Sequence, residues 1–183
     1  MCQKPETQLH IFSNCTSYLN RYTWRHDSVL KTISNKVSRS PCENVEVYVD
    51  CEHLSFPCTS GLFQSSRPDM VVKINNKIIA VELTVCFDTN TEKSRDYKTK
   101  RYRDLKSQLV VECDRFEIVY IEFTTLGFIG KKSFEQFQKL LQELNIYEDR
   151  TIIKCMEVAI RATYYIFCRR NNTWSNPELL NFY

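Results

Sequence analysis

Two carboxylates within apolar segments are the residues of this sequence best placed to do chemistry. Asp69 and Glu82 lie in SSRPDMVVKINNKIIAVELTV, residues 65–85, which otherwise predicts two apolar β-strands. The Asn75-Asn76 pair predicts a tight turn, because asparagine tolerates positive φ, and a two-residue turn sets Asp69 opposite Glu82. Facing carboxylates repel unless a cation lies between them. Their hard oxygen atoms favour Mg²⁺ or Mn²⁺ as that cation.

The alternation of side chains along this hairpin assigns its two faces. One face is apolar and is predicted to join the core: Met70, Val72, Ile74, Ile79, Val81, Leu83 and Val85. The other face carries the two acids: Asp69, Val71, Lys73, Ala80, Glu82 and Thr84. The alternative is an exposed hairpin face whose aligned acids are neutralised by Lys73 or Arg67.

The elements that must position this hairpin follow from hydrophobic periodicity. Apolar residues at helical spacing predict a helix over 23–37, and alternating valines predict a half-buried strand within 44–53. Residues 52–66 indicate a loop, 90–111 a helix and 115–130 a β-rich segment, with two further helices over 133–144 and 149–169. Residues 1–22 form a polar lead-in to this domain. The pattern predicts a single α/β domain with a mixed central sheet flanked by helices.

A lysine on the predicted helix could reach the carboxylates. Lys98, Tyr102, Leu105 and Leu109 share one helical stripe, so docking of the two leucines on the sheet would carry Lys98 toward them, with Tyr102 in support. Lys100 points about 200° around the helix from Lys98, so only one of the two reaches easily. The alternative is that Lys98 is an ordinary surface lysine.

Charge and composition limit the class of partner. The net charge is only +3, but residues 90–106 hold seven basic side chains against three acidic ones, a local stripe suited to a phosphate backbone or to a solvated helix face. The nine cysteines are scattered and follow no secretory signal, which favours reduced thiols. Because the best apolar run, IIAVELTVCF, is too short for a bilayer, we expect no membrane partner.

The hairpin resembles the core of the PD-(D/E)xK nuclease superfamily. Pro68-Asp69, a short turn and then Glu82 match its motif, whereas Thr84 stands where the family usually has its lysine. Some branches place that lysine on the following helix, as Lys98 is placed here. The resemblance implies a nuclease-like core in which Asp69 and Glu82 bind Mg²⁺ or Mn²⁺ and Lys98 acts in catalysis. We expect Thr84, on the same face of the hairpin as both acids, to have a supporting role.

The segments before the hairpin extend the resemblance. Cys2, His10 and Cys15, followed by RYTWRHD, resemble the C-terminal region of site-specific non-LTR retrotransposon proteins, where a CCHC zinc knuckle precedes a restriction-like endonuclease domain. The resemblance implies a truncated knuckle over 1–22, holding Zn²⁺ without its first cysteine, an endonuclease domain over 23–183, and a fragment or a domesticated piece. It also implies that Arg25 and His26 contact DNA. The alternative is that Tyr22 and Trp24 pack while Arg25 and His26 begin a helix with Asp27 in its first turn.

The leading functional hypothesis is therefore a magnesium-dependent endonuclease that nicks target DNA in the nucleus, after cytoplasmic synthesis, to prime reverse transcription. Its partners would be DNA, element RNA and a reverse transcriptase region absent from this chain. The alternatives are an inactive nuclease fold that binds DNA or RNA, and a protein-interaction scaffold. Cys42, Cys51, His53 and Cys58 offer a second zinc arrangement of a spacing that matches no known finger. The residues expected to contact DNA are Arg25, His26, Arg67, Lys100, Arg101 and Arg103.

Overall fold

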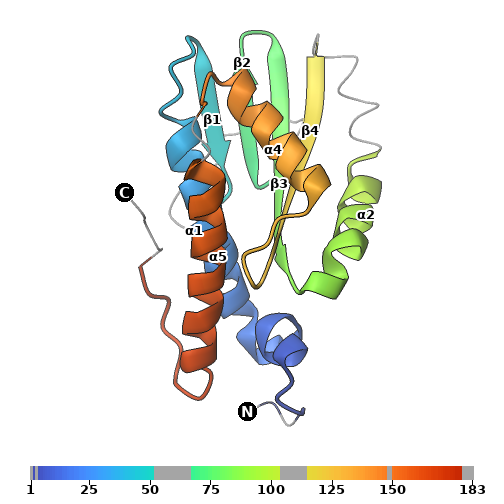
Figure 1. Cartoon of the computed structure of the whole chain (residues 1–183), viewed down its shortest axis with the longest axis vertical. Coiled ribbons are helices and arrows are strands. Elements are labelled where there is room, and N and C mark those ends of the chain that lie inside the picture. The colour runs from blue at the N-terminus through green and yellow to red at the C-terminus, as the bar shows by residue number, and fades with distance from the viewer. Residues whose placement is uncertain (1, 3, 52–66, 104–114, 148–149, 179–183) are drawn as a thin grey trace.

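The protein is a mixed α/β fold with one four-stranded sheet flanked by helices (Figure 1). The computed structural model describes residues 2, 4–51, 67–103, 115–147 and 150–178. The order of helices and strands confirms the order predicted from periodicity. The main elements are α1 (Leu19–Val37), β1 (Val45–Val49), β2 (Met70–Ile74), β3 (Lys77–Cys86), α2 (Thr91–Arg101), β4 (Arg115–Thr124), α4 (Lys131–Glu143) and α5 (Arg150–Cys168). Short helical turns occupy η1 (His10–Asn14), η2 (Thr16–Tyr18) and η4 (Asp88–Asn90).

The sheet has the strand order β1-β2-β3-β4. Strands β1, β2 and β3 pair antiparallel, whereas β4 pairs parallel to β3 after the crossover that contains α2. Met70 pairs with Val81 and Ile74 with Lys77, and Asn75 adopts a φ of 50°, so the predicted turn and register are confirmed.

The main core lies on one face of the sheet, beneath α1, α4 and α5. The predicted apolar face of the hairpin supplies Met70, Val72, Ile79, Val81 and Leu83 to it, each at most 1% exposed. Helix α5 packs lengthwise against α1, and α4 crosses the sheet beside them (Figure 1). These three helices cover that face of the sheet (Figure 1).

Helix α1 begins earlier than the sequence pattern indicates. It starts at Leu19 rather than near residue 23, so the prediction that Asp27 lies in its first turn is wrong. The first turns lack apolar periodicity and are fixed by tertiary contacts instead: buried Arg21 donates to the main-chain oxygen atoms of Arg169 and Asn172, each at 2.9 Å. Such contacts leave no periodic signal in the sequence.

The opposite face of the sheet is covered by α2 through polar contacts. The helix itself buries no side chain, and Tyr102, just beyond its end, is fully buried against Phe116 and Ile118. Arg95 Nε donates to Glu122 Oε1 at 2.9 Å and fixes the helix to β4. The predicted helical stretch beyond residue 103, with Leu105 and Leu109, lies outside the described residues, as does the predicted loop over 52–66.

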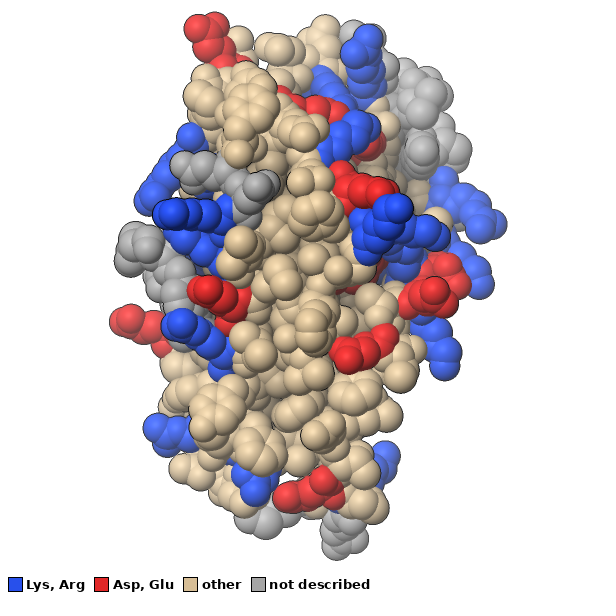
Figure 2. Space-filling view, viewed as in Figure 1, with Lys and Arg blue, Asp and Glu red and all other residues tan. Residues whose placement is uncertain are grey.

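The surface over α4 and α5 carries a strip of uncharged side chains. Figure 2 shows neutral side chains down its centre, with charged side chains along both margins. Ile153, Ile160 and Tyr164 of α5 are exposed. None of the described helices is both long and apolar enough to cross a membrane.

Candidate active site

Asp69 and Glu82 come together at the end of the β2–β3 hairpin. Asp69 directly precedes β2 and continues the register in which Met70 pairs with Val81, which sets it opposite Glu82. The Leu83 amide donates to Asp69 Oδ2 at 2.7 Å and fixes that carboxylate. The local sequence therefore determines the position of both acids.

Lys98 of α2 joins the two carboxylates. Its Nζ atom lies 2.8 Å from Glu82 Oε2 and 3.1 Å from Asp69 Oδ2, and it also donates to the Leu83 main-chain oxygen. Three oxygen atoms, two from β3 and one from Asp69 just before β2, thus converge on one ammonium group. Lys73 and Arg67, the other cations weighed for this role, pair with Glu46 and Asp50 instead.

Glu82 is the enclosed member of the pair, with its side chain only 2% exposed. The buried Tyr102 hydroxyl donates to Glu82 Oε1, so each carboxylate oxygen has a partner. Burial raises the pKa of Glu82, and the charge of Asp69 raises it further, while Lys98 acts in the opposite direction. Burial and the bond to Glu82 raise the pKa of Tyr102 as well, which keeps its phenol a donor.

Asp69 is more open, with 21% of its side chain exposed. Burial alone would raise the pKa of Asp69, but the hydrogen bond and charge of His26, together with Lys98, lower it to about 2. His26 Nε2 lies 3.4 Å from Asp69 Oδ1 and 3.3 Å from the Leu83 oxygen. Asp69 therefore remains an anion between two cations.

His26 is oriented by the next residue of α1. Its Nδ1 atom lies 3.0 Å from Asp27 Oδ1, and Asp27 is buried. Burial alone would lower the pKa of His26, but Asp27 and Asp69 outweigh it and raise the pKa to about 9. The structure thus places His26 in the network around Asp69, and its contact with DNA stays a prediction.

The two members of the Asp69–Lys98 ion pair line different clefts. The acidic cleft, of about 560 Å³, is lined by Asn20, Thr23, His26, Asp27, Asp50, Cys51, Arg67, Asp69 and Asn176. The basic cleft, of about 500 Å³, is lined by Ser13, Asn14, Tyr22, Arg25, Thr84, Val85, Cys86, Asn90, Lys93, Ser94, Tyr97 and Lys98. Because Asp69 lines one cleft and Lys98 the other, a substrate in either cleft would reach the same group of charges.

The other predicted DNA-contacting residues are distributed unevenly. Lys100, Arg101 and Arg103 are exposed on or just after α2, where a polyanion could contact them. Arg67 is exposed at the acidic cleft and lies 2.6 Å from Asp50. Arg25 is only 1% exposed and lines the basic cleft, so a contact to DNA through it would be made inside that cleft and not on the outer surface.

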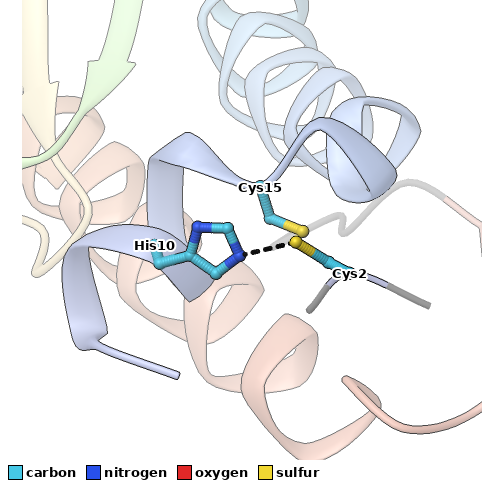
Figure 3. Close-up of side chains that lie close together, drawn as sticks. All are labelled: Cys2, His10 and Cys15. Atoms are coloured by element: carbon cyan, nitrogen blue, oxygen red, sulfur yellow. Dashed lines mark hydrogen bonds between the residues drawn. The ribbon is translucent and has the colours of Figure 1, made fainter. Parts of the chain in front are cut away.

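The lead-in gathers Cys2, His10 and Cys15 around one point (Figure 3). Their ligand atoms all lie within 4.8 Å of one another, and Cys2 Sγ lies 3.3 Å from His10 Nε2. Two thiols and one imidazole are ligands that suit Zn²⁺, which takes four. Tyr22 of α1 holds this segment in place by donating to the main-chain oxygen atoms of His10 and Ile11.

The second predicted cysteine arrangement is only partly described. Cys42 Sγ accepts a hydrogen bond from Asn145 Nδ2 at 3.1 Å, and Cys51 is buried at the acidic cleft. His53 and Cys58 lie outside the described residues. Among the residues that the structure describes, the only metal-ligating group of three is Cys2, His10 and Cys15.

Neither the scan of protein-family models nor the search of curated proteins found a match. The functional argument therefore rests on the geometry of the site.

Several residues of the site have no signal in the sequence strong enough to assign their role. His26 contacts Asp69 and the Leu83 oxygen only because α1 packs against β3. Asp27 gains its role by orienting His26 for these contacts. The only local signal is the adjacency of His26 and Asp27 in an otherwise mixed segment of α1.

Proposed function

We propose that this chain is a metal-dependent DNA endonuclease of the PD-(D/E)xK type, in which Asp69, Glu82 and Lys98 are the catalytic residues. The observation that carries the proposal is the convergence of both carboxylates and the Leu83 oxygen on Lys98 Nζ. Two carboxylates that can hold a metal ion, with a lysine beside them, suit the hydrolysis of a phosphodiester that a metal ion assists.

The chemistry of the donor set fits Mg²⁺ or Mn²⁺. Asp69, Glu82 and the Leu83 oxygen are hard oxygen donors that lie close enough together to share one cation, which in this structure is the Lys98 ammonium, and Asp69 lines the acidic cleft. When bound, the ion would lower the pKa of a coordinated water and offset negative charge on the phosphate. Tyr102 and Leu83 N–H hold the two carboxylates in position for it.

Lys98 serves this reaction as a cation. Burial opposes its charge, but Asp69 and Glu82 outweigh burial and raise the pKa of Lys98 above its ordinary value. A lysine that stays protonated does not remove the proton from water. It orients the attacking water and stabilises the negative charge that develops on the phosphate.

The wider setting of the proposal is the integration of a retrotransposon. A nick in nuclear target DNA would supply the end from which an upstream reverse transcriptase region copies element RNA. Lys100, Arg101, Arg103 and Arg67 would contact the DNA backbone, because neutralising phosphates dominates such binding. Zn²⁺ held by Cys2, His10 and Cys15 would order the lead-in beside α1.

One observation favours a second candidate, an inactive nuclease fold that binds DNA or RNA. Both Glu82 oxygen atoms and Asp69 Oδ2 already accept bonds from Tyr102, Lys98 and Leu83. A buried network satisfied in this way also serves as a structural ion pair that stabilises the fold. This candidate predicts DNA binding without cleavage in Mg²⁺ or Mn²⁺.

Cleavage of supercoiled plasmid tests the proposal directly. Purified protein should convert the plasmid to the nicked form in Mg²⁺ or Mn²⁺, and chelator should stop the reaction. Asp69→Ala and Glu82→Ala should each abolish nicking, while the control Glu46→Gln, at an exposed carboxylate on β1, should not. Undiminished nicking by purified, folded Glu82→Ala would refute the proposal, and binding without any nicking would favour the inactive fold.

A further inference from the structure

Arg25 is a buried cation without an acidic partner. It is 1% exposed, and its guanidinium donates only to neutral groups, Thr163 Oγ1 at 3.1 Å and the Val85 oxygen at 3.3 Å. Within the described part of the chain no carboxylate forms an ion pair with it. Burying a charge in this way is unfavourable unless an anion compensates it.

Other unpaired polar groups surround the same cleft. Within the described residues, five buried side-chain atoms have no hydrogen-bond partner, and three of these belong to residues of the basic cleft: Ser13 Oγ, Arg25 Nε and Thr84 Oγ1. Buried polar groups are normally satisfied, so three unpaired groups at one cleft indicate a site for a polar ligand. All three, two hydroxyls and one guanidinium N–H, can donate a hydrogen bond.

The charge of the cleft specifies the sign of that ligand. Its described lining includes Arg25, Lys93 and Lys98 and no aspartate or glutamate. Ser94 and Asn90 add further neutral polar groups at the start of α2. The acidic cleft, by contrast, contains Asp27, Asp50 and Asp69. Hydroxyl and guanidinium donors with cations and no carboxylate favour a phosphate group.

We propose that the basic cleft binds a backbone phosphate of the DNA strand next to the phosphate that is cleaved, with Arg25 and Lys93 as its cationic ligands. The choice of DNA as the source of the phosphate rests on the proposed function. The location follows from the structure: Lys98 lines this cleft and contacts Asp69 and Glu82, and Thr84 lies two residues along β3 from Glu82 on the same face. A phosphate held here positions the adjoining phosphodiester at the carboxylates.

Binding of inorganic phosphate tests the site independently of cleavage. Thermal unfolding is followed in chelator, with phosphate titrated against chloride at equal ionic strength. Wild-type protein should show a saturable rise in Tm, and Lys93→Met should lose it, whereas Lys132→Met should keep it. Both lysines are exposed and both changes remove one charge, so Lys132 of α4 is the matched control. Equal shifts in the wild type and Lys93→Met would overturn the site.

A DNA arm identifies the source of the phosphate. In chelator, the affinity of Lys93→Met for a short duplex should fall about tenfold more than that of Lys132→Met, the loss expected for one charge-assisted contact. If phosphate raises the Tm through Lys93 but the two variants bind duplex equally, the site takes a free phosphate and the DNA assignment is wrong. Neither measurement involves cleavage. A failed nicking assay would therefore refute the proposed nuclease activity but would leave the evidence for the phosphate site unchanged.

Thr84→Val separates a ligand role from a structural role. The two side chains have similar shapes, and the Thr84 hydroxyl has no partner among the described residues, so the free protein should lose no stability. The phosphate-induced rise in Tm should nevertheless shrink. A variant that unfolds earlier without phosphate but keeps the full rise would show that the hydroxyl is structural and contradict its place in the site.

Discussion

The basic and acidic clefts are of similar size but opposite charge, and one helix separates them. Helix α1 gives Tyr22 and Arg25 to the basic cleft and Asn20, Thr23, His26 and Asp27 to the acidic cleft. Adjacent residues of an α-helix point about 100° apart. Arg25 and His26 can therefore line different clefts. Helix α1, which also covers the core, thus places a cation in the cleft lined by Lys98 and an acid, Asp27, in the cleft lined by Asp69.

The opposite charge of the two clefts suggests a different ligand for each: a metal ion for the acidic cleft and an anion for the basic cleft. Asp69 is the more open of the two carboxylates and lines the acidic cleft but not the basic one, so under the proposed function a metal ion would enter from the acidic cleft. Anion binding requires donors without carboxylates, and the basic cleft supplies them. Hydrolysis of a phosphodiester under the proposed function uses both a metal ion and an anion-binding group. The bound DNA strand would therefore lie across the Asp69–Lys98 pair, whose members line the two clefts.

Removal of Lys98 should have the largest effect, because it contacts both acids. Lys98→Met should reduce nicking about 10²–10³-fold, the range for loss of one charge-stabilising group. It should also lower the free energy of unfolding by about 3–5 kcal/mol, since two carboxylates then face each other without a cation. Plasmid nicking and urea unfolding measure these effects.

Lys98→Arg is the control for stability in that experiment. It retains the charge, yet a planar guanidinium does not match three oxygen atoms arranged around an ammonium. Stability should largely return while nicking stays low. If Lys98→Met nicks as well as the wild type, Lys98 is a structural cation only.

His26, which lines the acidic cleft, should make the free energy of unfolding depend on pH. Its folded-state pKa of about 9 exceeds the ordinary 6.5, so its contribution is complete below pH 6.5 and is lost as pH rises through 9. The shift corresponds to about 3 kcal/mol. Urea unfolding between pH 6 and 9.5 should show this loss in the wild type and a flatter profile in His26→Gln. Parallel profiles would contradict the raised pKa.

The β2–β3 hairpin shows which features of the site could be predicted from the sequence. Positive φ at Asn75 and the period-two pattern are local, so they fixed the register and placed Asp69 opposite Glu82. Lys98 was accessible because helical spacing linked it to Tyr102, which is buried beside Glu82. The order of elements likewise followed from periodicity alone.

The remaining features depend on contacts between distant segments. The parallel pairing of β3 with β4, the earlier start of α1 and the bond from His26 to Asp69 are each decided by tertiary packing. Arg25 shows the limit most clearly, because a basic residue in a polar segment indicates a surface contact, whereas packing of α1 between β3 and α5 buries it. Local patterns carry no information on such burial.

The two clefts should respond separately to their ligands, which sharpens the comparison. Mn²⁺ and phosphate should each raise Tm by about 3–6 °C at tenfold excess over Kd. Asp69→Asn should lose the Mn²⁺ response and keep the phosphate response, while Lys93→Met should do the reverse. Thermal unfolding with each ligand alone gives the four values. Loss of both responses in either variant would show that the clefts form one inseparable site.

The smallest effect on nicking is expected at the lead-in, which lies apart from both carboxylates. Cys2→Ser removes one thiol from the group with His10 and Cys15, so bound Zn²⁺, measured by mass spectrometry of the metal, should be lost. Because Tyr22 still anchors this segment to α1, nicking should change less than about twofold, well below the effect of a lost charge-stabilising group. Cys42→Ser, outside the group, is the control and should keep its Zn²⁺. A large loss of nicking in Cys2→Ser would mean that the lead-in helps to shape the basic cleft through Ser13 and Asn14.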